Sequence, residues 1–281
     1  MIDEESDTMN FIRLTDFDIE RCQEIFKIAD QLQTKEYHGD LAGKTVVMFF
    51  SDSSIRTRVA FEKGVHLLGG QTILFPPEAL DKKERIRDAV GYLNNWANLI
   101  VVRHKSIELI QEMANYATCP VINALSDVNH PCEVLSDMYA LSKMRSDYRN
   151  AKYLFCGVKG NIGYAWKEAS EVFGFELEQC CVKGYEMEGI ASYDDIRRAI
   201  IGKDIIIMDS LPAEALSKQV QVTKEIMDMA NSGAILNPCP PFFIGEEVSE
   251  DAVNSDYFVG YEFKNYLLQV QQAIMIYCLK E

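Results

Sequence analysis

One stretch of this chain contains a complete strand–helix–strand pattern: TVVMFFSDSSIRTRVAFEKGVHLLGGQTILFP, residues 45–76. It begins with a β-branched and aromatic run, passes through a Ser-rich turn into a helical pattern, and ends in a second apolar run. Because parallel strands need a crossover connection such as a helix, the stretch predicts a βαβ unit with two parallel strands. The same alternation continues on its carboxyl side over most of the chain.

Further short apolar runs alternate with helical patterns beyond this unit. They occupy residues 98–103, 120–125, 152–158, 176–182, 204–210, 234–239 and 257–262. This rhythm predicts an α/β fold with two domains, each a parallel sheet flanked by helices. The polar segment SDYRN (146–150) marks the expected boundary. We therefore expect domains at 1–146 and 147–264, and a helix at 265–281 that returns to pack on the first domain.

Composition restricts the classes of function. The 281 residues include 28 Lys and Arg against 43 Asp and Glu, a formal net charge of -15, which repels nucleic-acid phosphate and anionic lipid. No apolar run approaches the roughly 20 residues of a membrane span. The acidic start MIDEESDTMN does not resemble a signal peptide. We expect a cytoplasmic protein without a nucleic-acid or membrane partner, in which a local basic cluster must hold any anionic ligand.

Cysteine usage gives no indication of a metal site. The 8 cysteines are scattered, with no CxxC pair and no nearby His at zinc-ligand spacing. In a reducing compartment they behave mostly as small buried apolar residues. Cys132 and Cys239 lie beside candidate site residues, and for both we favour packing over chemistry.

The segment FFSDSSIRTRVAFE (49–62) is the first candidate site, because ligands of open α/β sheets bind beyond the carboxyl ends of strands. Ser54, Arg56, Thr57 and Arg58 lie where the predicted helix begins. Free N–H groups and the positive dipole end there suit a phosphate, and an Arg guanidinium adds bidentate contact. The same residues also fit a Ser N-cap followed by solvated arginines.

Two more strand ends carry polar side chains. Arg103 and His104 end the run NLIVVR, and His130 follows PVINAL within the segment NHPCE (129–133). A lone His is more often structural than catalytic. A phosphate turn, an Arg and a His at one edge of a sheet together predict a site for a phosphorylated carbonyl compound, with Arg and His stabilising a developing oxyanion.

The second half of the chain contributes three weaker motifs. The glycines of GVKGNIGY (157–164) do not have the G-x-G-x-x-G spacing of a dinucleotide fingerprint, which disfavours NAD. Asp209 ends a predicted strand and is either a site residue, a helix cap or a solvated loop carboxylate. The Pro-dense turn LNPCPPF (236–242) is a candidate for a cis peptide.

Together these motifs resemble those of the aspartate/ornithine carbamoyltransferase family. The phosphate turn resembles the family's Ser-Thr-Arg-Thr-Arg loop, VVRH its Arg-His strand end, and NHPCEVLSD its His-Pro-x-Gln-x-Leu-x-Asp segment. GNIG, MDS, NPCP and GEEV follow in the family's order, so the resemblance covers nearly the whole chain. It implies that an amine attacks the carbonyl carbon of carbamoyl phosphate and expels phosphate, with no metal or other cofactor.

The resemblance assigns the first domain, 1–146, to carbamoyl phosphate. It implies that Arg56, Arg103 and His130 are catalytic, and that the donor is bound by Ser54, Ile55, Arg56, Thr57, Arg103, His130 and Glu133. Arg58 matches an arginine that acts as a structural clamp. Two positions depart from the family: Ile55 replaces a Thr, and Glu133 replaces the Gln that holds the carbamoyl amide.

The second domain, 147–264, would bind the acceptor. Asn161, Asp209 and Cys239 match acceptor contacts of the ornithine enzymes, although Pro240 and Pro241 leave the register of Cys239 open by one residue. Lys82 resembles a loop lysine that reaches a neighbouring subunit's site, which implies a homotrimer.

A carboxylate at position 209 favours an ammonium-bearing acceptor, so an ornithine-like amino acid or a diamine ranks above aspartate. Residues 212–214 lack the family's Ser-Met pair, and Tyr266 stands where many ornithine enzymes have Arg, which weakens the case for ornithine itself. An aspartate-type enzyme, a non-catalytic relative that binds a metabolite or a protein, and a nicotinamide-dependent enzyme remain as alternatives.

Overall fold

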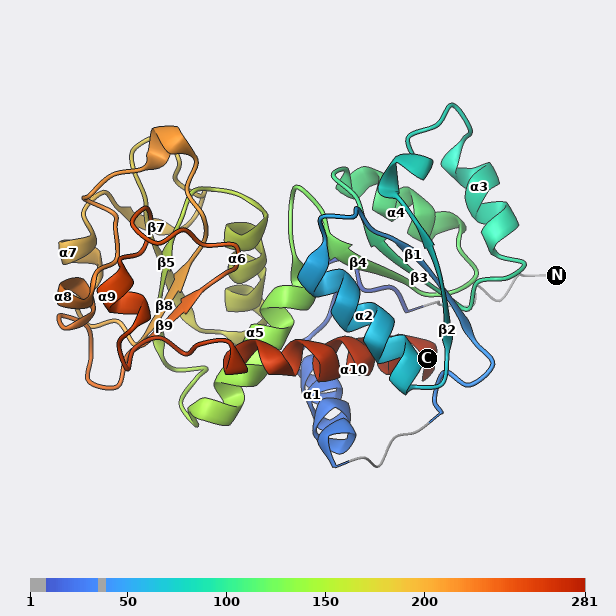
Figure 1. The fold of residues 1–281 in the computed structure, drawn as a ribbon, viewed down its shortest axis with the longest axis horizontal. Helices are drawn as coiled ribbons and strands as arrows, with labels where there is room; N and C mark the ends of the chain where they lie inside the picture. The colour runs from blue at the N-terminus through green and yellow to red at the C-terminus, as the bar shows by residue number, and fades with distance from the viewer. Residues whose placement is uncertain (1–8, 35–38, 281) are drawn as a thin grey trace. The chain divides into compact units, whose positions relative to one another are not determined.

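The computed structural model describes residues 9–34 and 39–280 (Figure 1). The acidic stretch at 1–8 and the outer domain limits at 1 and 281 lie outside the described residues. The chain divides into two compact units, Met1–Tyr139 with Asn265–Glu281, and Ala140–Lys264. The division at Tyr139 falls inside one helix, α5 (Pro131–Met144). Each unit contains its own parallel sheet, which confirms the predicted α/β class.

The first unit contains a four-stranded parallel sheet in the order β2-β1-β3-β4. Its strands are β1 (Thr45–Phe49), β2 (Gln71–Phe75), β3 (Leu99–Arg103) and β4 (Val121–Leu125). All of them match predicted runs to within one residue at each end. β1, β3 and β4 are adjacent in the sheet, so their carboxyl ends lie at one edge.

Helices cover both faces of this sheet. They are α1 (Ile19–Gln33), α2 (Ile55–Leu67), α3 (Ile86–Leu93), α4 (Ile107–Tyr116), the first part of α5, and α10 (Tyr266–Lys280), with short 3-10 turns at Leu14–Asp16 and Pro77–Ala79. A further 3-10 turn, Glu262–Asn265, spans the division between the two units. On one face, Val47, Ile100 and Val102 pack with Val90 of α3 and Ile110 of α4. We did not predict α1, although Asp18 caps it and its buried residues recur at helical spacing.

The carboxyl-terminal helix belongs to the first unit, as predicted. α10 packs against both α1 and α2, and Figure 1 shows α2 and α10 side by side. At the crossing, the Gln272 Nε2 donates to the Gly64 carbonyl at 3.1 Å. A Cβ on Gly64 would lie 3.0 Å from Gln272 Cγ, so a glycine permits this close approach.

The second unit contains a five-stranded parallel sheet in the order β7-β6-β5-β8-β9. Its strands are β5 (Lys152–Cys156), β6 (Glu176–Cys180), β7 (Ala191–Tyr193), β8 (Ile205–Met208) and β9 (Ile235–Pro238). The short and largely exposed β7 was not predicted. The strand predicted at 257–262 is wrong: the segment makes one isolated bridge, between Leu236 and Phe258, before Gly260 turns the chain at φ +70°.

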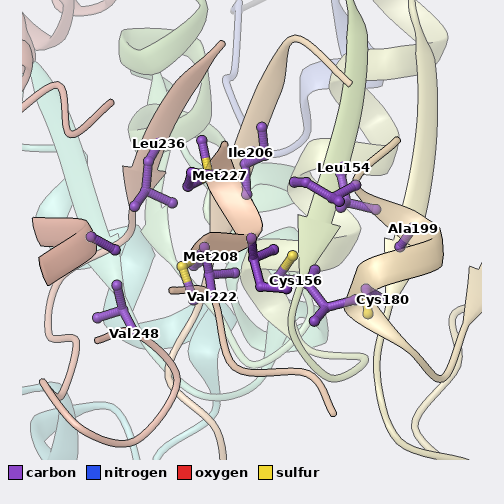
Figure 2. Close-up of a cluster of buried hydrophobic side chains, with 14 of the residues drawn as sticks. Leu154, Cys156, Cys180, Ala199, Ile206, Met208, Val222, Met227, Leu236 and Val248 are labelled. Atoms are coloured by element: carbon purple, nitrogen blue, oxygen red, sulfur yellow. The ribbon is translucent and has the colours of Figure 1, made fainter. Parts of the chain in front are cut away.

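Alternation along β5 separates two cores. Tyr153 points to the face of α6 (Asn161–Phe173), where it packs with Trp166 and Phe175. Leu154 and Cys156 point to the opposite face, where the buried cluster drawn in Figure 2 includes side chains from β8 and β9. That face is covered by α7 (Ile196–Ala199), α8 (Lys224–Met227) and α9 (Glu250–Val253), with a 3-10 turn at Ala213–Ala215. This arrangement leaves Asp209 directly after β8, at the carboxyl edge of the sheet.

Candidate functional site

The turn after β1 carries the candidate phosphate ligands. Ser54 is the N-cap residue of α2, and Ser54 and Thr57 are both buried. The Ser54 hydroxyl makes no capping hydrogen bond and lies 3.2 Å from the Ser51 hydroxyl. Ile55 is 69% exposed, and its apolar side chain has no hydrogen-bond donor. This residue can therefore offer a phosphate only its backbone N–H. The turn therefore has the geometry of a helix N-terminus that receives an anion.

Arg58 differs from Arg56 in its partners. The Arg58 Nη1 lies 3.4 Å from Asp52 Oδ1, and its Nε lies 3.6 Å from Glu62 Oε2. These long ion pairs hold Arg58 along the surface of α2. The structure thus supports the structural role that the resemblance implied for it.

Arg103 ends β3 and is partly buried at the carboxyl edge of the first sheet. Burial lowers the pKa of its guanidinium, the positive charge of Arg56 lowers this pKa further, and the carboxylate of Glu133 opposes both. Arg56 at the start of α2 and Glu133 at the start of α5 therefore each lie within electrostatic reach of Arg103 at the end of β3.

The two histidines at this edge have different surroundings. His104 is buried, its Nδ1 accepts from the Ser106 N–H at 3.1 Å, and its Nε2 lies 3.0 Å from Asp81 Oδ1. Because Nδ1 accepts a hydrogen bond, the proton of the neutral ring is on Nε2, and this N–H donates a hydrogen bond to Asp81. Both ring nitrogens of His104 are thus engaged in holding the segment that contains the exposed Lys82, which makes His104 structural.

His130 is buried immediately before α5. The turn that leads to it is fixed by buried amides and a hydroxyl: Asn123 Nδ2 donates to Asn129 Oδ1 at 2.7 Å, and the Ser126 hydroxyl donates to the same oxygen at 3.1 Å. We predicted no role for Asn123 or Ser126 from the sequence. Their only local indication of a structural role was that polar residues interrupt the end of an apolar strand.

The first turn of α5 carries two neighbouring residues with different roles, Cys132 and the candidate ligand Glu133. Glu133 is buried, and its negative charge raises the pKa of Arg103. Cys132 is buried beside it, its Sγ donates to the Asn123 carbonyl at 3.4 Å, and burial raises the pKa of its thiol well above the ordinary value. A thiol held protonated is a poor nucleophile, so Cys132 packs, as expected.

In the second unit, Asp209 is the most strongly perturbed carboxylate. Burial raises its pKa to about 6, the Ser210 N–H bonded to its Oδ1 at 2.9 Å opposes this rise, and the nearby Glu247 adds to it. Asn161 begins α6 after β5. Cys239 follows β9, and its N–H donates to the Met208 carbonyl at 2.7 Å. These three residues follow adjacent strands, and the expected cis peptide is present between Pro240 and Pro241.

Sequence analysis missed Glu247, which lies in the GEEV segment. Its side chain is 1% exposed, its Oε1 accepts from the Phe243 N–H at 2.6 Å, and its Oε2 has no hydrogen-bond partner among the described residues. By contrast, the neighbouring Glu246 is exposed. The apolar Val248 was the only local signal that this segment is buried.

Tyr266, in the first unit, packs edge-to-face on Tyr139, with the two ring centroids 5.3 Å apart.

In residues 9–34 and 39–280, no three His, Cys, Asp or Glu side chains are grouped so that they could hold a metal ion. No helix in the same residues is both long and apolar enough to cross a membrane. All 8 cysteines are buried and unpaired by disulfides.

Comparisons with known proteins agree with the motifs. Residues 9–143 match the model of the aspartate/ornithine carbamoyltransferase carbamoyl-phosphate binding domain. The ornithine carbamoyltransferase of Syntrophotalea carbinolica is 30% identical over 95% of this chain and 97% of its own length, and that of Desulfotalea psychrophila is 31% identical over 85% and 87%. The crystal structure of ornithine carbamoyltransferase from Burkholderia thailandensis superimposes with a TM-score of 0.89 at 26% identity, covering 96% of this chain and 98% of that one. The chain belongs to the aspartate/ornithine carbamoyltransferase family.

Proposed function

We propose that this protein transfers the carbamoyl group of carbamoyl phosphate to the amino group of an ornithine-like amino acid or a diamine, and releases phosphate. One observation supports the proposal most: Arg103 is partly buried close to a second cation, Arg56, in a chain whose net charge is -15. Concentrated cations at a helix N-terminus are what a dianionic donor needs. The relatives named above act on ornithine, which supports an amine acceptor.

The proposed donor half-site works by positioning and charge. Ser54 and Thr57 donate hydroxyl hydrogen bonds to the phosphate, Ile55 contributes its backbone, and Arg56 neutralises charge on the leaving group. Arg103 and His130 stabilise the carbonyl oxygen as it becomes negative in the tetrahedral intermediate. Glu133 accepts from the carbamoyl NH₂ group, as the family's Gln would through its amide oxygen.

In the proposed reaction, the lone pair of a neutral amine forms a new nitrogen–carbon bond at the carbamoyl carbon. The bond from that carbon to the phosphate oxygen then breaks, phosphate leaves with the electron pair, and the amine nitrogen loses a proton. The chemistry needs no covalent enzyme intermediate. Its rate depends on how well the two substrates are aligned and how well the oxyanion is stabilised.

The proposed acceptor half-site consists of Asn161, Asp209 and the region of Cys239. Asp209 is a partly buried carboxylate, and the described residues place no cationic partner on it. A positively charged group on the acceptor would restore the electrostatic balance there, whereas a second carboxylate on the acceptor would be repelled. This favours ornithine-like and diamine acceptors over aspartate.

We also propose a cytoplasmic homotrimer in which Lys82 reaches a neighbouring subunit. Lys82 is exposed, and exposed apolar side chains gather on α2 and the edge strand β2: Ile55, Val59, Ile73 and Phe75 are each at least 40% exposed. Clustered apolar side chains of this kind are typical of a covered interface. Sedimentation of the pure protein tests the assembly, and a monomer would contradict a shared site.

The deciding experiment is a steady-state assay with carbamoyl phosphate and a panel of ornithine, N-acetylornithine, putrescine and aspartate. We expect carbamoylated product with at least one cationic acceptor and little with aspartate. A clear preference for aspartate would overturn the assignment. Calorimetry separates the remaining alternatives: binding of carbamoyl phosphate without turnover for any amine indicates a non-catalytic relative, and binding of NADH indicates a nicotinamide enzyme.

A further inference from the structure

Glu247 is a buried carboxylate for which the fold has no full set of partners. One oxygen, Oε1, accepts from the Phe243 N–H and so holds the segment after the Pro-dense turn. The other oxygen, Oε2, has no hydrogen-bond partner among the described residues, although the side chain is only 1% exposed. An ionised oxygen buried without a donor is costly, so this oxygen requires a partner such as a bound water, an ion or a ligand group.

The fold holds Glu247 beside the segment that carries Asp209. Val248 follows Glu247, Met208 precedes Asp209, and both valine and methionine belong to the same buried cluster (Figure 2). Backbone contacts tie Glu247 to another member of this cluster, Val222: the Val222 N–H donates to the Glu247 carbonyl at 2.9 Å, and Val222 pairs with Val248.

The charges near these two carboxylates have the same sign. Glu247 raises the pKa of Asp209, and burial together with the neighbouring Glu246 raises the pKa of Glu247. Within the described part of the chain, neither Asp209 nor Glu247 forms an ion pair with a Lys or Arg. A buried and a partly buried carboxylate that repel each other create a demand for a cation that the protein does not itself supply.

We propose that Glu247 is a second carboxylate of the acceptor subsite, and that Glu247 and Asp209 together bind the non-reacting ammonium group of a diamine. This inference rests on the proposed function for the identity of the ligand as the acceptor. One ammonium between two carboxylates satisfies Glu247 Oε2 and relieves the repulsion. An α-amino acid brings its own carboxylate next to its ammonium, so it fits this pair less well than a diamine does.

The test uses the full-length protein with putrescine as the probe, in the presence of millimolar inorganic phosphate. We expect calorimetric titration to show putrescine binding to the unaltered protein, and a Kd about tenfold to a hundredfold weaker for Glu247→Gln. The Gln side chain keeps an oxygen for the Phe243 N–H, so the turn stays held while the charge is removed. Glu246→Gln is the matched control, because it removes one adjacent but exposed carboxylate, and we expect its Kd to stay within twofold.

Donor binding separates this inference from the proposed function. Titration with carbamoyl phosphate is expected to give the same Kd for Glu247→Gln and the unaltered protein. If carbamoyl phosphate does not bind and no amine is carbamoylated, the proposed function fails, yet weaker putrescine binding by Glu247→Gln still supports the carboxylate pair. If the unaltered protein does not bind putrescine, if Glu247→Gln binds it as tightly, or if Glu246→Gln loses as much, the carboxylate pair is overturned.

Discussion

The two sheets of this protein are built alike and carry opposite charges at their carboxyl edges. In the first unit, partly buried Arg103 lies near Arg56, and burial lowers its pKa. In the second unit, partly buried Asp209 lies within electrostatic reach of Glu247, and desolvation raises the pKa of Asp209 to about 6. Both shifts are toward the neutral form, because desolvation penalises any charge regardless of its sign.

At each edge, partly desolvated charges of one sign raise the free energy of the unliganded protein. A ligand of the opposite charge would lower it. An anion lowers the cost at Arg103 and Arg56, and an ammonium lowers it at Asp209 and Glu247. Under the proposed function, stability is given up at both places in exchange for ligand affinity, a trade that is common at functional sites. Removing a charge should therefore weaken binding, and at Asp209 it should also stabilise the fold.

The largest effect is expected from Arg103→Gln, which removes the cationic edge of the first sheet. We expect kcat/KM for carbamoyl phosphate to fall about 1000-fold, since a preorganised donor to an oxyanion contributes about 3–4 kcal/mol. Steady-state kinetics measure this. Arg58→Gln is the matched control, because Arg58 pairs with Asp52 and Glu62 instead, and its rate should change less than threefold. Equal losses in both variants would show that the comparison is wrong.

His130→Ala is expected to lower kcat about 100-fold while the Kd for inorganic phosphate stays within threefold. In the proposed mechanism the imidazole acts on the developing oxyanion, whereas the turn at Ser54 holds the phosphate. Turnover assays and phosphate calorimetry on the same variant measure the two quantities. Unchanged turnover would remove His130 from the mechanism.

Asp209→Asn is expected to stabilise the folded protein in a pH-dependent way. The folded pKa of about 6 lies above the ordinary 3.8, so the aspartate loses stability as pH rises between these values, by about 3 kcal/mol in total. The Asn variant avoids this loss and keeps an oxygen for the Ser210 N–H. Urea unfolding should therefore show a stabilisation of up to about 3 kcal/mol at pH 7.5 that disappears near pH 4. A difference that does not vary with pH would contradict the buried-charge explanation.

The smallest effect is expected from Glu133→Gln, which restores the residue type of the family motif. Removing a negative charge near Arg103 should tighten phosphate binding, because the carboxylate repels the phosphate. We expect a gain of only about threefold to tenfold, since solvent at the partly exposed edge screens this repulsion. Calorimetry measures the Kd. Asp127→Asn is the control, since Asp127 is exposed on the loop before α5. Weaker phosphate binding by Glu133→Gln would mean that this carboxylate supports the donor half-site through another contact.

The sequence predicted the first sheet almost completely, because its strands are short buried runs with distinct helices between them. Its failures were local too. α1 precedes the first recognised unit, β7 is an exposed strand of three residues, and the segment 257–262 has strand composition but only one bridge. A composition rich in aromatic residues does not distinguish a paired strand from a half-exposed segment that touches a sheet once.

Residue order along the chain was enough to establish the βαβ rhythm, the Ser-rich turn before α2, and the placement of Arg103, His130 and Asp209 after strands. All of these follow from periodicity and short motifs, which are local properties. Tertiary structure alone decided which histidine is structural, since Asp81 and Ser106 engage His104. It alone placed Glu247 near Asp209. Burial and desolvation depend on what packs around a group, and residues far apart in the chain supply that packing.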